Sequence, residues 1–178
     1  MRSMFKGNLP LHVAHTLTGG AVSLVTGGAG FLGSQLCDKL LDTCSVICID
    51  SLRFGRRESI TALLGRENFT FIDYDITRPI TDLLRKKVDY IFYVAGVDEL
   101  VKAKKATLDD LLVNTYGTRN LLEKALSDNA KFLLISTLEH KGHIDEAIDS
   151  AQARLFAENM TAHYIEKFGL DGRIVRVG

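Results

Sequence analysis

The stretch that decides the fold is Thr26-Gly27-Gly28-Ala29-Gly30-Phe31-Leu32-Gly33 (TGGAGFLG), which follows the apolar run 21–25. Its glycines satisfy both GxGxxG, from Gly28, and GxxGxxG, from Gly27. A strand pattern precedes the turn and a helical pattern follows it. Main-chain N–H groups and the positive end of the helix dipole would therefore converge where a pyrophosphate can bind. The stretch predicts a dinucleotide-binding turn; a tight turn kept only for packing is the alternative.

Outward from this turn, short apolar runs alternate with stretches at helical spacing. The predicted strands are 22–26, 45–50, 69–73, 90–95, 131–136 and 173–177, and the predicted helices are 30–41, 58–64, 81–86, 108–126 and 148–168. The runs are almost continuously apolar, as strands covered by helices on both faces are. This pattern predicts an α/β fold: a Rossmann-type doubly wound parallel sheet of strand order 3-2-1-4-5-6. A ligand crevice is expected at the carboxyl ends of the first and fourth strands.

The length and charge of the chain limit its organisation and its partners. Its 178 residues suit one domain, which we place at 21–178. Residues 1–20 are predicted to be a loosely attached or disordered leader, with a transit peptide as the alternative. Because 22 basic side chains balance 22 acidic ones, no field exists to attract nucleic acid or an anionic membrane. No run of 18 apolar residues occurs, so no membrane span is expected.

The chain contains three cysteines, Cys37, Cys44 and Cys48. They are odd in number and form no CxxC pair, which argues against a disulfide framework or a zinc site. We interpret them as small buried side chains. They favour a reducing compartment, and we predict a cytoplasmic protein without a metal site.

Asp50 ends the second predicted strand, about twenty residues beyond the glycine turn. A carboxylate there can accept hydrogen bonds from the adenosine ribose hydroxyls and repel a 2′-phosphate, which favours NAD over NADP. Arg53, Arg56 and Arg57 follow closely. A guanidinium among them could instead hold a phosphate, or the three could form a solvated basic turn.

Six motifs together support a resemblance to a known family: TGGAGFLGS, ICIDSLRFGRRESI, FIDYDITRP, VDYIFYVAG, NTYGTRNLLEKA and KFLLISTLEH. The set resembles the extended short-chain dehydrogenase/reductase family of NAD-dependent epimerases and dehydratases, over residues 21–178. Within it, the motifs are most similar to nucleotide-sugar enzymes of the UDP-glucuronate decarboxylase and UDP-glucose 4-epimerase kind. The resemblance implies NAD as cofactor. In relatives a smaller substrate domain follows the last strand, and the chain stops at that point.

The resemblance extends the predicted cofactor site beyond the glycine turn. It implies that Asp75 and Ile76 flank the adenine, that Ala95 and Gly96 line the cofactor, and that Asn114 braces neighbouring strand ends. By the residues alone, Asp75 could merely cap a turn and Asn114 could be an ordinary helix polar group. The full predicted set is Gly27, Gly28, Gly30, Phe31, Leu32, Gly33, Asp50, Arg53, Asp75, Ile76, Ala95, Gly96 and Asn114.

The catalytic positions implied by the resemblance carry other residues. Family members use a Tyr, a Lys four residues later on the same helix, and a Ser or Thr after the fifth strand. Ser150, Arg154 and Leu138 stand at these positions here. A serine hydroxyl is far less acidic than a phenol, and arginine differs from lysine in shape and reach, so neither conserves the role. Glu139 and His140 are the alternative catalytic candidates, since a histidine can act as a base near neutral pH.

We therefore predict an NAD-binding domain that has lost catalysis and acts as a regulatory or scaffolding module. The alternative is an active NAD-dependent nucleotide-sugar epimerase, dehydratase or decarboxylase, seen as a fragment or using unconventional residues. The expected partners are NAD(H), a nucleotide-sugar and a second copy of the chain. The homodimer is predicted through the helices at 108–126 and 148–168, whose leucines exceed one sheet-facing stripe.

Overall fold

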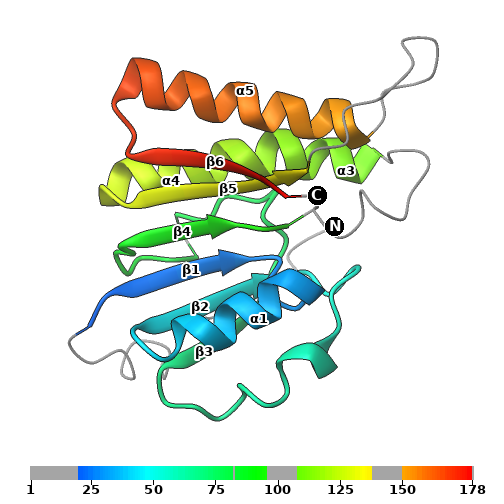
Figure 1. The fold of residues 1–178 in the computed structure, drawn as a ribbon, viewed down its shortest axis with the longest axis vertical. Coiled ribbons are helices and arrows are strands. Elements are labelled where there is room, and N and C mark those ends of the chain that lie inside the picture. The colour runs from blue at the N-terminus through cyan, green and yellow to red at the C-terminus, as the bar shows by residue number, and fades with distance from the viewer. Residues whose placement is uncertain (1–19, 82, 96–107, 138–149, 178) are drawn as a thin grey trace, which may run out of the picture.

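The computed structural model describes residues 20–81, 83–95, 108–137 and 150–177, except for the side chains of Asp110, Ser150 and Ala151. Six parallel strands form one sheet of order β3-β2-β1-β4-β5-β6, which confirms the predicted fold and order (Figure 1). The strands are β1 (Val22–Thr26), β2 (Ser45–Asp50), β3 (Phe69–Asp73), β4 (Tyr90–Tyr93), β5 (Lys131–Thr137) and β6 (Gly172–Val177). The sequence boundaries of the first three strands are reproduced, whereas β4 ends two residues earlier than predicted.

Helices cover the sheet on its two faces. The helix α1 (Phe31–Leu40) packs on β1 and β2. On the opposite face lie α3 (Leu108–Leu112), α4 (Thr118–Asp128) and α5 (Ser150–Phe168) (Figure 1). There α4 packs on β4 and β5, α5 packs on β5 and β6, and the two helices contact each other. Each face has its own apolar core, and β1 and β2 are buried along their whole length between the two. This double burial is why those strands are continuously apolar.

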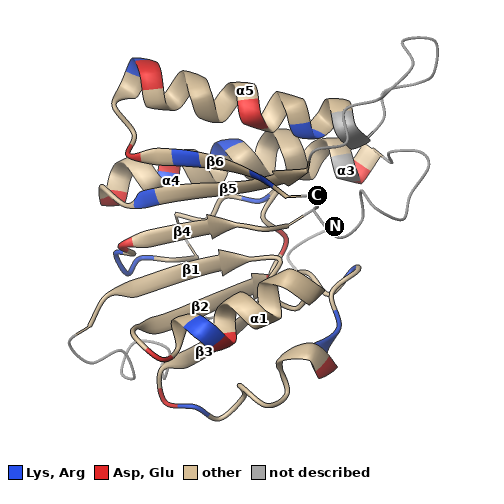
Figure 2. Cartoon of the chain, in the orientation of Figure 1, with Lys and Arg blue, Asp and Glu red and all other residues tan. Residues whose placement is uncertain are grey.

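The register places the carboxyl ends of neighbouring strands together. Thr26, the last residue of β1, pairs with Ile49 of β2 and with Tyr93 of β4. Asp50 follows Ile49 and closes β2. Charged residues lie mainly at strand ends and on helix surfaces, and β1 and β4 carry none (Figure 2). The carboxyl ends of β1, β2 and β4 therefore lie together at one edge of the sheet.

The structure has no α-helix at two places where the sequence predicts one, within the residues that it describes. The segment 58–64 contains a single 3₁₀ turn, η2 (Arg57–Ile60). Within the described part of 81–86 there is no helix, although Leu84 N–H bonds to Ile80 O at 2.8 Å. The Tyr74 hydroxyl donates to Pro79 O at 2.9 Å, at the point where the predicted helix would begin. A segment this short cannot offset the cost of helix nucleation without strong packing.

The predicted helix 108–126 is interrupted by a π-helical turn, η3 (Val113–Gly117). Side-chain hydroxyls compete for its carbonyls: Thr115 Oγ1 donates to Leu111 O at 2.7 Å, and Thr118 Oγ1 donates to Asn114 O at 2.8 Å. From outside the helix, the Tyr93 hydroxyl donates to Val113 O at 2.8 Å. A π-turn inside an α-helix often marks a functional site, and this one lies beside the end of β4.

Candidate functional site

The glycine turn fits tightly between β1, β4 and α1. Gly27 has φ +72°, and its N–H donates to Ile49 O at 2.8 Å. A Cβ atom at Gly27 would lie 2.6 Å from Ala95 Cα, and one at Gly33 would overlap Gly27 O. Only glycine tolerates both the left-handed backbone and these approaches. The turn therefore brings α1 directly onto the carboxyl ends of β1 and β4.

Gly28 rests on two buried thiols. A Cβ atom there would overlap Cys48 Sγ and lie 3.2 Å from Cys37 Sγ. A hydrogen bond with Cys37, together with burial, raises the pKa of the Cys48 thiol well above its ordinary value. The protonated thiol is a poor nucleophile, so the pair acts as packing beneath the turn.

Gly30 is the N-cap of α1 and has extended backbone, φ −75° and ψ 175°, without a side-chain cap. The N-terminus of a ten-residue helix thus faces the site without a capping side chain over it. Phe31, the first helical residue, is 75% exposed, whereas Leu32 is half-buried and packs against the α1-side core. The helix dipole favours an anion at this end, and a pyrophosphate could bind there.

Asp50 is only 7% exposed and ties the turn to β2. Its Oδ2 accepts from Ala29 N at 3.0 Å and its Oδ1 accepts from Leu52 N at 2.8 Å. A Cβ at Gly55 would lie 2.7 Å from Oδ2, so the loop after β2 packs closely on the carboxylate. Each carboxylate oxygen has more than one lone pair, so Asp50 could also accept from ribose hydroxyls.

The arginines after β2 have contacts within the protein. Arg53 forms an ion pair with Asp109 at the start of α3 and lies 5.0 Å from the Phe54 ring centroid. Arg57 lies 5.3 Å from the Phe71 ring centroid. The charge of Arg53 is therefore paired with a carboxylate, and Arg57 lies against an aromatic ring.

Asp75 and Ile76 form the turn after β3. Asp75 Oδ1 accepts from Thr77 N at 2.9 Å, so its carboxylate caps this turn, the alternative that the sequence left open. Ile76 is buried, and its main-chain oxygen accepts from Asn120 Nδ2 of α4 at 2.9 Å. A Cβ at Gly117 would lie 3.0 Å from Ile76 Cδ1, which locks this turn against the π-helical segment.

Arg154 of α5 joins elements that are distant in the sequence. It is completely buried, and its Nη1 donates to Ala95 O and to Asn114 Oδ1, both at 3.0 Å. Its Nη2 donates to Ile135 O of β5, and the guanidinium lies 4.9 Å from the Tyr93 ring centroid. One side chain therefore links β4, β5 and η3 immediately beneath the edge where the glycine turn lies.

Burial lowers the pKa of the Arg154 guanidinium, and the nearby Tyr93 and Glu158 oppose that shift. A guanidinium nevertheless stays charged at any physiological pH, so its hydrogen bonds to carbonyls are charge-assisted. Among the described residues, three buried side-chain atoms have no hydrogen-bond partner: Thr26 Oγ1, Ser136 Oγ and Arg154 Nε. All three belong to the carboxyl half of the sheet or to the helix packed on it.

The structure brings most of the predicted cofactor residues to one edge. The glycine turn, Asp50 and Ala95 meet directly, and Asn114 lies behind them. Gly96, Leu138, Glu139 and His140 lie outside the described residues, as does the side chain of Ser150 at the start of α5. In the described part of the chain no group of three potential metal ligands occurs. Nor does any helix found there have the length and apolar character that crossing a membrane requires.

Sequence reasoning missed Tyr93, Thr26 and Ser136. Tyr93 is fully buried, stacks on Arg154 and hydrogen-bonds η3. Within an apolar run, a tyrosine or a hydroxyl residue looks like one more strand residue. The only signal in the sequence that could have identified these three residues is their position near the carboxyl end of a strand.

The comparison with family models gives one decisive result. The model of the NAD dependent epimerase/dehydratase family matches residues 23–178. The chain belongs to this family. The matched residues include the glycine turn and Asp50, and the family is named for its dependence on NAD.

The chain is similar to UDP-glucuronic acid decarboxylases from animals and plants. The chain is 32% identical over 171 residues to UDP-glucuronic acid decarboxylase 1 of Danio rerio, covering 86% of this chain and 40% of that protein. It is 33% identical over 171 residues to UDP-glucuronic acid decarboxylase 1 of Arabidopsis thaliana, covering 86% and 38%. It therefore spans about two fifths of the length of these relatives.

Solved structures agree with the fold. UDP-glucuronic acid 4-epimerase from Bacillus cereus, in complex with NAD, superposes with a TM-score of 0.70 at 26% identity, covering 87% of this chain and 55% of that one. A UDP-galactose 4-epimerase superposes with a TM-score of 0.71 at 27% identity, covering 87% and 55%. The chain therefore has the fold that these nucleotide-sugar epimerases share over about half of their length.

Proposed function

We propose that this chain binds NAD or NADH at the edge formed by the glycine turn, Asp50 and Ala95. The pyrophosphate lies over 27–33 at the N-terminus of α1, and the Asp50 carboxylate accepts from the adenosine ribose. The fit rests on the closeness of the turn to β4 and on the buried position of Asp50. Asp75 and Ile76 border the adenine from the turn after β3.

We propose further that the site binds the cofactor without using it for sugar chemistry. The observation that carries this proposal is Arg154, at the position where the family resemblance implies lysine. Its guanidinium donates to Ala95 O, Asn114 Oδ1 and Ile135 O. A guanidinium that donates to these three acceptors holds the neighbouring elements together. It does not lower the pKa of a tyrosine, and the tyrosine position, one turn earlier on α5, carries Ser150.

Bound NAD supplies a hydride acceptor, and this chain's residues determine what can be done with it. The glycine turn and Asp50 orient the dinucleotide, and the apolar strand ends exclude water beneath it. A serine at the tyrosine position leaves no phenol to take the proton of a sugar hydroxyl. The function supported best is therefore that of a cofactor-binding regulatory or scaffolding domain.

The second candidate function is an active nucleotide-sugar epimerase, dehydratase or decarboxylase. The observation in its favour is the similarity to UDP-glucuronic acid decarboxylases over 86% of this chain. In that case Glu139 and His140 would carry the acid–base chemistry, or the chain would act as part of a longer enzyme. A nucleotide-sugar would then be the second ligand.

Calorimetry of the 178-residue chain with NAD and with NADPH tests the binding proposal. We expect heat from NAD and none, or much weaker binding, from NADPH, because Asp50 repels a 2′-phosphate. If NADPH binds more tightly than NAD, we would infer that Arg53, Arg56 and Arg57 contact the 2′-phosphate of the ribose. Absence of heat from both would refute the site.

We also propose that the chain forms a homodimer through α3, η3 and α5. Large apolar side chains are exposed there: Leu108 (70%), Tyr116 (56%), Leu155 (39%) and Phe156 (49%). Exposed apolar groups gathered on one side of a domain are typical of an interface between subunits.

A further inference from the structure

A short exposed segment follows β2 and lies next to α1 (Figure 1). Its sequence, RFGRRES over residues 53–59, contains three arginines and one glutamate. Every residue of the segment except Gly55 is exposed, whereas Ile60, which comes directly after it, is fully buried. The segment therefore ends with a serine at the surface, Ser59, that follows a cluster of positive charge.

The Ser59 hydroxyl has guanidiniums two and three residues before it. Among the described residues, neither this hydroxyl nor the Arg56 guanidinium forms a hydrogen bond or an ion pair. Arg57 lies 5.3 Å from the Phe71 ring centroid and is exposed as well. Arg53 differs, because its charge is paired with Asp109. The contacts of the fold therefore leave the charge of Arg56 unpaired.

The backbone places Arg56 and Ser59 on the same side of the turn η2. Ser59 N donates to Arg56 O at 3.0 Å, which is the hydrogen bond of a 3₁₀ turn. Side chains three residues apart eclipse in such a turn. A phosphate on Ser59 would carry a charge of about −1.5 to −2 at neutral pH. It would lie beside a guanidinium, the side chain that makes the strongest hydrogen bonds to phosphate oxygens.

We propose that Ser59 is a phosphorylation site for an arginine-directed serine kinase and that the phosphate pairs with Arg56. Carboxylates in the substrate groove of such a kinase recognise guanidiniums two and three residues before the acceptor hydroxyl. Ser59 Oγ attacks the γ-phosphorus of ATP, and the new Oγ–P bond replaces the P–O bond to ADP, which leaves. The hydroxyl proton passes to the aspartate base of the kinase.

The kinase reaches Ser59 when the turn η2 opens. Two main-chain bonds close this turn: Ser59 N donates to Arg56 O at 3.0 Å, and Thr61 N donates to Glu58 O at 3.3 Å. The Thr61 hydroxyl adds a bond to Arg57 O at 3.2 Å. A single exposed turn of this kind opens locally at a much smaller cost than global unfolding.

The test incubates the 178-residue chain with ATP and the catalytic subunit of cAMP-dependent protein kinase. Mass spectrometry then counts and locates the phosphate. We expect one phosphate, on Ser59, and no modification of Ser59→Ala. The matched control is Ser51→Ala, which removes another exposed serine of the same loop, one that follows an aspartate, and it should be modified at the unmutated rate.

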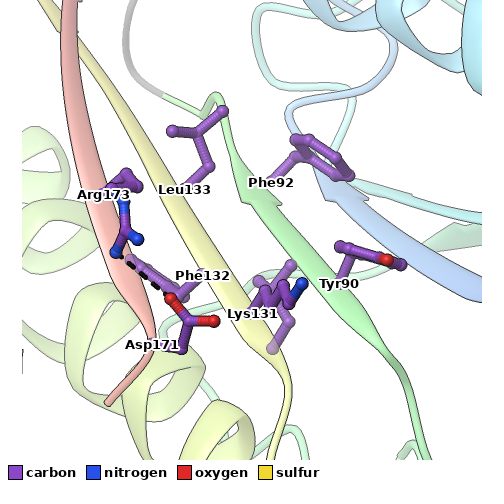
Figure 3. A pocket seen from close by; sticks show the side chains of 8 residues that line it. Tyr90, Phe92, Lys131, Phe132, Leu133, Asp171 and Arg173 are labelled. Carbon is purple, nitrogen blue, oxygen red and sulfur yellow. Dashed lines mark hydrogen bonds and ion pairs between the residues drawn. The ribbon is translucent and has the colours of Figure 1, made fainter. Parts of the chain in front are cut away.

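Two arginine variants test recognition by the kinase. Arg56→Gln should be phosphorylated at least about tenfold more slowly, because it loses a hydrogen bond between charged groups. Arg173→Gln removes an arginine from the hollow at the amino ends of β4, β5 and β6 (Figure 3), and it should react at the unmutated rate. Equal rates for the two variants, or a phosphate on another hydroxyl, would overturn the proposal. So would a folded chain that stays unmodified, whether or not the free peptide 53–62 is modified.

Phosphorus NMR of the modified chain tests the pairing with Arg56. A guanidinium beside the phosphate favours the dianion and lowers the phosphate pKa below its usual value of about 6. The phosphate should therefore titrate at lower pH in the unmutated chain and in Arg173→Gln than in Arg56→Gln, which longer incubation brings to full modification. The same titration curve in all three proteins would show that Arg56 does not hold the phosphate.

Discussion

At the scale of single residues, the site rests on two buried charged side chains with opposite tasks. Asp50 holds the glycine turn to β2 by accepting from the main-chain N–H groups of Ala29 and Leu52. The Arg154 guanidinium donates to Ala95 O after β4, to Asn114 Oδ1 in η3 and to Ile135 O in β5. We propose that Asp50 also contacts the adenosine ribose, and that Arg154 has a structural role alone.

Replacing Asp50 tests its proposed contact with the adenosine ribose. We expect Asp50→Asn to weaken NAD binding at least about tenfold, because a hydrogen bond from a ribose hydroxyl to a charged acceptor is worth about 1.5–3 kcal/mol. Calorimetry measures the loss. Asp73→Asn, at the exposed end of β3, is the matched control and should bind NAD as the unmutated chain does. Unchanged binding by Asp50→Asn would show that the ribose does not contact this residue.

Replacing Arg154 should reveal its role as a brace. Arg154→Lys is expected to reduce the free energy of unfolding by about 2 kcal/mol or more. A single ammonium cannot reach all three acceptors, and each buried acceptor left unpaired costs about 1–3 kcal/mol. Urea denaturation measures the change, with Arg173→Lys at the exposed start of β6 as control. A lysine variant as stable as the unmutated chain would contradict the role assigned to Arg154.

The sequence could predict the glycines and Asp50 but not the Arg154 contacts. The glycine turn is local: its spacing, its strand and its helix are all read within one stretch of chain. The Arg154 contacts join residues 59, 40 and 19 positions apart, and they exist only when β4, β5 and η3 meet. Tyr93 was missed for the same reason.

At the scale of elements, the strands were predictable because burial on both faces demands continuous apolar runs. The helices were less so. The run 108–126 has a continuous helical pattern, yet hydroxyls of Thr115 and Thr118 and the phenol of Tyr93 compete for its carbonyls and widen it into η3. Such competition depends on side-chain orientation, which periodicity does not report.

The close contact between η3 and the turn after β3 predicts a coupled pair of substitutions. Gly117→Ala should lower the free energy of unfolding by about 1 kcal/mol, although alanine is the better helix former. The added Cβ would lie 3.0 Å from both Cδ1 and Cγ1 of Ile76, a buried side chain with little room to move. Thermal unfolding of Gly117→Ala in an Ile76→Ala background, which lacks both atoms, supplies the control. Shortening the side chain at 76 should remove most of the cost, and a cost that stays the same would disprove this contact.

At the scale of the whole molecule, the chain is one doubly wound sheet that spans about two fifths of its curated relatives. Large apolar side chains are exposed on α3, η3 and α5, and we propose that a second copy of the chain covers them. Periodicity could not have predicted this interface, since a buried face and an interface have the same apolar pattern.

The dimer proposal predicts that one charge on α5 produces a monomer. We expect Phe156→Asp to halve the mass measured by light scattering at tens of micromolar protein, because it places a carboxylate in an apolar interface. The matched variant Ala162→Asp, at an exposed position further along α5, should remain dimeric. A monomeric mass for the unmutated chain would remove the proposal altogether.

The most direct measurement of the central claim is a single-turnover experiment on the 178-residue chain. The chain is mixed with saturating NAD and with UDP-glucuronate or UDP-glucose, and NADH absorbance is followed, with binding of NAD verified in the same sample. We expect bound NAD and no NADH signal from the unmutated chain. We expect little gain from Ser150→Tyr with Arg154→Lys, because acid–base groups contribute about 10²–10⁴ in rate only when the substrate is positioned. A clear NADH transient from the unmutated chain would contradict the claim and would direct attention to Glu139 and His140 as catalytic groups.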